Sequence, residues 1–247
     1  MTKIGAIAGR DLHVMFGGPL AWTLVGTFTF LSGYFFFSDL SFYVLFGGGN
    51  LPAGLWRFVF LHDRLVAMLV VPLVTMRLIA EERKLGTLEL LWSLPVRDRE
   101  VIAGKLLAAL VIYLVMLAGS ALGPALLWVL HPYSVAPLVA GYLGLVLLGA
   151  AFIACGLAAS CVSENQVVSA MLTYGIIVFL WFVSANEAAI GESFSWIVVG
   201  LSLFDRFSGF AQGVIDLRDV VFFLAFTTLF LFLALRALGS RAWRGVV

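Results

Sequence analysis

The residue types that commonly do chemistry are sparse in this chain of 247 residues, and they are not arranged as a catalytic site. The three histidines, His13, His62 and His131, lie far apart, and one of them, His62, has an acidic neighbour in Asp63. A zinc site needs about four ligands brought close together. No pattern of serine, histidine and acidic residue typical of a hydrolase is recognisable either. We therefore predict neither a catalytic site nor a metal site.

The two cysteines, Cys155 and Cys161, are six residues apart in one apolar stretch. On a single helix they would be separated by about 9 Å along the axis. That distance is too long for a disulfide, so we predict two free, buried thiols.

A nucleotide-binding loop of the form G-x-x-x-x-G-K-[ST] is absent from the sequence. Gly104-Lys105 is followed by leucine, and the glycines at 47–49 have no lysine after them. The chain itself is therefore predicted to bind no nucleotide and to need no cofactor of its own.

The composition indicates the class of protein to which this chain belongs. Hydrophobic residues make up 62% of the chain and charged residues 12%, and the mean hydropathy is +1.08. Soluble domains are about 25% charged. These values exclude a soluble enzyme, a disordered tail and a basic nucleic-acid binder, so we expect no nucleic-acid partner and a large contact with membrane lipid.

Six apolar stretches have about the length that a membrane-spanning helix requires. They are too long and too uniformly apolar for the strands of a lipid-embedded barrel. We predict an all-α polytopic membrane protein with one domain, residues 1–247, and six transmembrane helices. The predicted spans are Leu20–Phe37, Phe58–Met76, Leu106–Leu130, Pro137–Ser160, Val167–Ala185 and Val220–Leu238.

The basic residues predict the orientation, because cytoplasmic loops carry an excess of lysine and arginine. With six spans, both termini lie on one side, and that side carries 11 of the 15 basic residues. We therefore expect a multi-pass membrane protein with both termini in the cytoplasm. The 11 residues are Lys3, Arg10, Arg77, Arg83, Lys84, Arg97, Arg99, Lys105, Arg236, Arg241 and Arg244.

Two further segments are amphipathic or only partly polar. Residues Lys3 to Phe16 carry apolar side chains at helical spacing, interrupted by Asp11, and predict an amphipathic helix on the cytoplasmic membrane surface. The external segment from Asn186 to Asp219 contains an apolar run that is too short to span. We expect that segment to form re-entrant or interfacial helices between spans five and six.

The segment between spans two and three has the strongest pattern. Charges of both signs come first, then Gly86, which can end a helix in the left-handed conformation. Thr87 can cap a new short helix, which Pro95 would end. The residues alone allow either an ordinary interfacial loop or a docking helix. The candidate residues are Glu81, Glu82, Arg83, Lys84, Gly86, Thr87, Leu88, Glu89, Leu91 and Trp92.

This segment resembles the coupling-helix region of type-two ABC transporter permeases, whose usual pattern is ERxxGTLExLxxxP. The resemblance rests on residues 81–91, on Leu94-Pro95 and on Gly104-Lys105. Residues 203–207 and 213–219 are similar to the gliding-motility, GldF-like branch and to the permeases of nitrous-oxide-reductase maturation. Arg97 departs from the serine or threonine that is common in relatives, which leaves the start of the third span open.

The resemblance implies a permease subunit with a cytoplasmic coupling helix between helices two and three. It implies an ABC ATPase partner, in two copies, that binds ATP and magnesium, and a second permease subunit, the same or homologous. The function implied is an exporter or a lipid- or envelope-component machine, of the gliding-motility type or, alternatively, for nitrous-oxide-reductase maturation. A membrane protein with a periplasmic domain would be a further partner, and a scaffold subunit without net transport stays open as another class.

His62, Asp63 and Arg64 lie near the outer end of the second span. Charged side chains at this depth either pair or reach the interface. The alternative is that they form an external gate.

Overall fold

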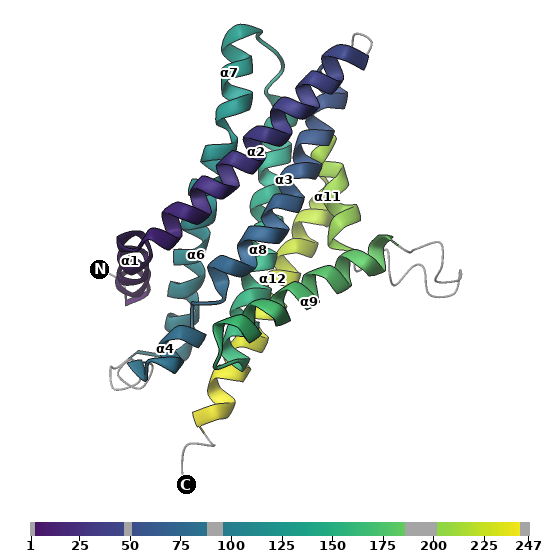
Figure 1. Cartoon of the computed structure of the whole chain (residues 1–247). Coiled ribbons are helices and arrows are strands. Elements are labelled where there is room, and N and C mark those ends of the chain that lie inside the picture. Colours follow the sequence, from purple (N-terminus) through teal and green to yellow (C-terminus); the bar gives the residue numbers. More distant parts are fainter. Residues whose placement is uncertain (1–2, 47–50, 88–95, 186–201, 243–247) are drawn as a thin grey trace, which may run out of the picture.

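A computed structural model describes residues 3–46, 51–87, 96–185 and 202–242, and every regular element in these ranges is a helix (Figure 1). The predicted all-α class is therefore confirmed for the described residues. The helices are α1 (Lys3–Gly17), α2 (Pro19–Phe46), α3 (Leu51–Thr75), α4 (Ala80–Lys84), α6 (Asp98–Ser120), α7 (Leu122–Leu130), α8 (Ala136–Val162), α9 (Gln166–Ala185), α11 (Leu203–Ala211) and α12 (Leu217–Ala242).

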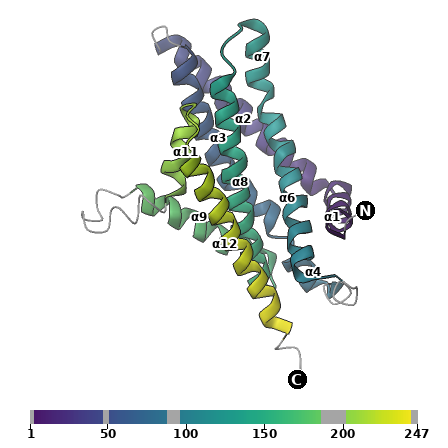
Figure 2. The same cartoon turned by 180° about the vertical axis from the view of Figure 1, so that it is seen from behind.

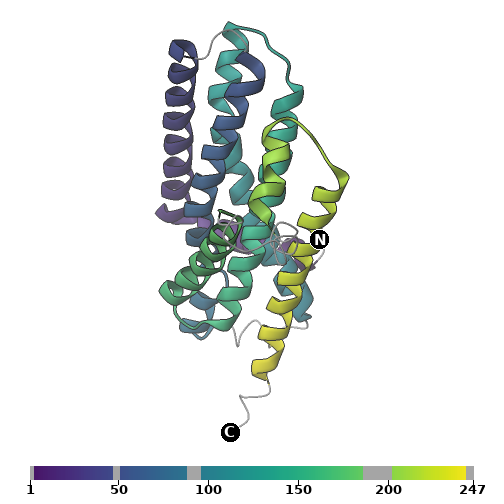
Figure 3. The ribbon, with the colours of Figure 1, turned by 90° about the vertical axis from the view of Figure 1, so that its right-hand side faces the viewer.

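Five stretches of the described chain are long and apolar enough to cross a membrane. They contain α2, α3 with α4, α6 with α7, α8, and α12. The fifth predicted span, Val167–Ala185, is not confirmed, and so the predicted total of six is not confirmed either. The apolar stretch Gln166–Phe182 is shorter than the other five, and α9 runs obliquely to α8 (Figures 1 and 3).

Helix α8 is the centre of the bundle, and it packs against α3, α6, α9, α11 and α12. Figure 2 shows α12 along the same axis direction as α8, on the side away from α2. Helix α8 can occupy this position because glycines on its packing faces let neighbouring side chains approach closely. A Cβ atom at Gly149 would lie 2.0 Å from the ring of Tyr113, and one at Gly156 would lie 2.0 Å from Thr75 Oγ1.

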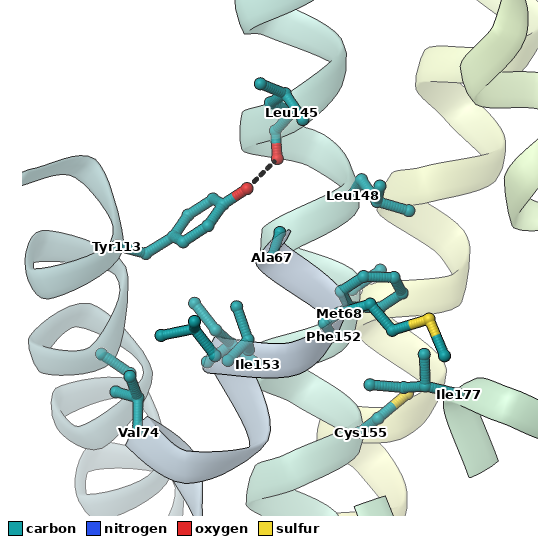
Figure 4. Close-up of a cluster of buried hydrophobic side chains, with 14 of the residues drawn as sticks. Ala67, Met68, Val74, Tyr113, Leu145, Leu148, Phe152, Ile153, Cys155 and Ile177 are labelled. Carbon is teal, nitrogen blue, oxygen red and sulfur yellow. Dashed lines mark hydrogen bonds between the residues drawn. The ribbon is translucent and has the colours of Figure 1, made fainter. Parts of the chain in front are cut away.

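The core around α8 is apolar and contains few polar groups (Figure 4). The Tyr113 hydroxyl donates a hydrogen bond of 3.0 Å to the Leu145 carbonyl oxygen, so this buried phenol is satisfied. Cys155 and Cys161 are free and buried, which confirms the prediction.

Helix α1 covers the segment that the sequence predicts to be an amphipathic helix, and it lies crosswise to the long helices (Figures 1 and 3). Its place on a membrane surface stays a prediction. Its buried residues are Ile7, Ala8 and Asp11. A Cβ atom at Gly104 of α6 would meet the Ile7 side chain at 2.8 Å, so the glycine allows α1 and α6 to approach closely.

Candidate functional site: the junction around helix α4

Helix α4 begins where α8 supplies an acceptor for its free backbone donors. The first N–H groups of a helix have no partner inside the helix. Here the Ser160 hydroxyl of α8 accepts hydrogen bonds from Ile79 N and Ala80 N, each of 3.0 Å. The Ser160 side chain is fully buried, so these bonds form away from water and fix the start of α4 to α8.

Arg83 makes a second connection from α4 to the end of α8. Its guanidinium donates to the carbonyl oxygens of Cys161 at 3.0 Å and Ser163 at 3.1 Å. These carbonyls belong to the last residues of α8, where the helix dipole favours a positive charge. The C-terminal end of α4 is therefore also attached to α8.

Glu82 connects α4 to α1 and α6 through a network of four charges. Lys105 Nζ of α6 lies 2.8 Å from Glu82 Oε2 and 3.1 Å from Asp11 Oδ2. Arg10 of α1 lies 2.8 Å from Asp11 Oδ1 and 2.5 Å from Glu82 Oε1. The network contains two cations and two carboxylates. Each charge therefore has neighbours of the opposite sign, which an ionised group needs when it leaves water.

The Lys105 side chain is only 2% exposed. Burial by itself lowers the pKa of Arg10, but the hydrogen bond and charge of Asp11, together with Glu82, raise this pKa above its usual value. Through their carboxylate partners, the two cations join three helices that are distant in sequence.

The sequence did not predict this network. Asp11 interrupts the apolar stripe of α1, and an acidic residue on a buried face indicates that a cation faces it. Lys105 gave no such signal, because the excess of basic residues on the cytoplasmic side already accounted for it.

The end of α4 agrees with the sequence prediction. Helix α4 ends at Lys84, and Gly86 has a positive φ of 70°. A left-handed glycine of this kind commonly ends a helix. The Thr87 hydroxyl donates to the Glu82 carbonyl oxygen at 3.2 Å. Of the predicted coupling residues, Leu88, Glu89, Leu91 and Trp92 lie outside the described residues.

Helix α6 begins at Asp98, directly after the residue that departs from the pattern of relatives. The Arg97 backbone N–H donates to Glu100 Oε2 at 2.8 Å, so Glu100 stabilises the start of the helix without a serine or threonine cap.

Two of the predicted gate residues, His62 and Arg64, contact different helices of the fold. His62 Nδ1 lies 2.8 Å from Asp39 Oδ2 of α2. Arg64 donates to the Phe204 carbonyl oxygen of α11 at 3.2 Å, and its guanidinium lies 4.9 Å from the centre of the Phe204 ring. Asp63 is 2% exposed, and no described residue forms an ion pair with it.

Successive residues of a helix point about 100° apart, which is why His62 and Arg64 face different helices. The gate itself stays a prediction. Asp39 and Phe204 are the partners that sequence reasoning missed.

The sequence that forms these helices has a match among protein families. Residues 64–240, more than half of the chain, match the family described as ABC-2 family transporter protein. The chain belongs to the ABC-2 transporter family. A comparison with curated proteins found no match.

Membership in the ABC-2 family makes this chain a multi-pass membrane permease of an ABC transporter. Such permeases work with an ABC ATPase and are generally not catalytic themselves. The matched residues include α4, α6, α8 and the Arg64 contact, but not α1.

Proposed function

We propose that this permease is driven by a separate ATPase through α4 and the residues that follow it, as far as Trp92. The ATPase partner, in two copies, supplies the ATP and magnesium sites, and this chain binds neither. The observation that carries the proposal is the attachment of α4 to α1, α6 and α8 by the bonds of Ser160, Arg83 and Glu82. A segment attached in this way moves together with the membrane helices.

The orientation follows from the charges around this junction. Arg10, Arg77, Lys84, Arg97 and Arg99 lie in α1, α4 and the adjoining segments. This concentration favours a cytoplasmic location for the junction and for both termini in the bacterial inner membrane.

Two permease subunits, the same or homologous, would form the transport path. Helices α2 and α9 both pack against α3, and both leave large apolar side chains exposed. Their exposed faces are suited to a second subunit or to lipid. Exposed residues of these faces include Phe30, Phe37, Met171, Phe179 and Phe182.

Few charges lie within the spans, which favours an amphipathic substrate over a bare ion. A lipid- or envelope-component machine is the best fit, and the gliding-motility and nitrous-oxide-reductase-maturation branches are two more specific versions of this function.

On the outer side, Arg64 holds α11 against α3, so a gate there would open by moving α11. A membrane protein with a periplasmic domain would bind on that side.

The test is a purified complex of the permease and its ATPase in lipid vesicles, with ATP hydrolysis and transport measured together. We expect the Ser160→Ala variant to retain the ATPase but to lose most of its transport-linked ATP hydrolysis, because two buried N–H groups of α4 lose their acceptor. Ser208→Ala, a change at a half-buried serine of α11, is the control. Full coupling in Ser160→Ala would contradict the proposal. Hydrolysis without any transport in the unmodified complex would favour the scaffold class.

A further inference from the structure

A pocket of about 640 Å³ lies between α1, the start of α2, and the α3–α4 connection. One part of its lining is charged, and the rest is largely apolar. The apolar part includes Val14, Met15, Leu20 and Leu85. The charged part consists of Arg10, Asp11, Arg77, Glu81, Glu82 and Lys105.

The side chains around the pocket indicate that it lies at the level of the membrane surface. It is lined by the amphipathic helix α1, whose Val14 side chain is exposed. Trp22, two residues after Leu20, is also exposed, and its ring N–H donates to the Phe16 carbonyl oxygen at 3.0 Å. An exposed tryptophan with a satisfied N–H is typical of the boundary between hydrocarbon and headgroups.

The charges of the pocket fall into two groups. Arg10, Asp11, Glu82 and Lys105 pair with one another within 3.1 Å. Arg77 and Glu81 make only a long contact, with 3.8 Å between Arg77 Nε and Glu81 Oε2.

Arg77 Nε is buried, and it has no hydrogen-bond partner among the described residues. A buried donor without a partner is costly, so the pocket offers one guanidinium N–H that lacks an acceptor. Glu81, one helical turn later, offers a carboxylate beside it.

We propose that this pocket binds the headgroup of a zwitterionic, amine-bearing glycerophospholipid from the leaflet on whose surface α1 lies. The phosphate oxygens accept from Arg77, and the ammonium group donates to Glu81. The acyl chains extend over the apolar wall of Val14 and Leu20.

The charge balance selects this class of ligand. The pocket has three cations and three carboxylates, so a headgroup with one charge of each sign meets a partner for both. A purely anionic headgroup satisfies Arg77, but it brings a second negative charge close to Glu81 without an ammonium to offset it. Arginine binds phosphate through several directed N–H donors.

The experiment measures lipid retention by native mass spectrometry of the purified full-length permease, without an ATPase. The probes are phosphatidylethanolamine and phosphatidylglycerol with the same acyl chains. We expect phosphatidylethanolamine to be retained about tenfold more strongly, the size of one charge-assisted contact. Equal retention of the two lipids, or preference for phosphatidylglycerol, would overturn the proposal.

Two variants locate the bound lipid. We expect Arg77→Gln to reduce retention of phosphatidylethanolamine about tenfold, whereas Arg99→Gln, at an exposed cation outside the pocket lining, leaves retention unchanged. Gly18→Leu fills the pocket without a clash, since a Cβ atom there meets nothing closer than 3.9 Å. It removes the lipid and keeps all six charges. Retention by both pocket variants would place the lipid elsewhere and overturn the proposal.

Soluble glycerophosphoethanolamine separates a lipid site from a site for the free headgroup. It lacks the acyl chains that contact Val14 and Leu20, so we expect little displacement of the bound lipid. Displacement at the same concentration as the lipid would contradict a membrane ligand. Since no step of this experiment involves nucleotide or ATPase, its failure leaves the proposed coupling through α4 untouched.

Discussion

Asp11 and Lys105 show how single residues hold the cytoplasmic junction together. Each would be costly to bury alone, and each is stabilised by the other and by Arg10 and Glu82. From the sequence, Asp11 looked like an interruption of an apolar stripe. Its partner could not be identified, because a pair separated by 94 residues depends on how α1 lies against α6.

At the residue scale we predict that Lys105→Met destabilises the permease by about 3 kcal/mol, because it leaves two carboxylates facing one cation. Thermal unfolding of the purified protein measures the change. Lys84→Met, at an exposed lysine of α4, should change stability by less than about 0.5 kcal/mol. A variant that combines Lys105→Met with Asp11→Asn should recover part of the loss. If Lys105→Met is as stable as Lys84→Met, then the network contributes nothing to the free energy of unfolding.

The helices differ in how well their lengths and positions follow from sequence. Apolar run length predicted α2, α3, α8 and α12, because burial in lipid requires long uninterrupted helices. It predicted the third span as one helix, whereas the structure has a break at Ala121 between α6 and α7. It could not predict the oblique course of α9, because composition gives a helix its length but not its tilt.

At the element scale we predict that Gly149→Ala destabilises the packing of α8 against α6 by about 2 kcal/mol, since the added methyl group overlaps the Tyr113 ring. Membrane yield and thermal unfolding measure this loss. Gly175→Ala on α9 is the matched control, because a Cβ atom there meets nothing within 4 Å. If Gly149→Ala is as stable as Gly175→Ala, then α6 and α8 are not closely packed at this point.

The whole molecule has two ends of different character. The end that carries α4 is rich in charges that join helices, whereas the contacts of Arg64 with α11 lie toward the other end (Figure 1). The sequence predicted this asymmetry from the distribution of basic residues. It could not predict which charges are paired, and it grouped His62, Asp63 and Arg64 because they are consecutive.

At the scale of the molecule we predict opposite accessibility for two exposed positions, Leu85 and Val214. In a background without Cys155 and Cys161, a membrane-impermeant thiol reagent added from outside should label Val214→Cys and not Leu85→Cys. Labelling after the membrane is opened is the control, since both positions should then react. Outside labelling of Leu85→Cys in intact cells would reverse the proposed orientation.

Our central proposal is that the ATPase drives the permease through α4 and the residues that follow it, as far as Trp92. Co-purification of the ATPase with permease variants tests this proposal most directly. Leu88 and Leu91 lie outside the described residues. Their place in the segment that resembles a coupling helix implies that both side chains contact the ATPase. A buried leucine contributes about 1.5–3 kcal/mol, so Leu88→Asp and Leu91→Asp should each release the ATPase while the permease still inserts into the membrane. Gly175→Ala on α9, which leaves both leucines in place and has room for its methyl group, should retain the ATPase. Full ATPase binding and transport-linked turnover in both aspartate variants would contradict the account.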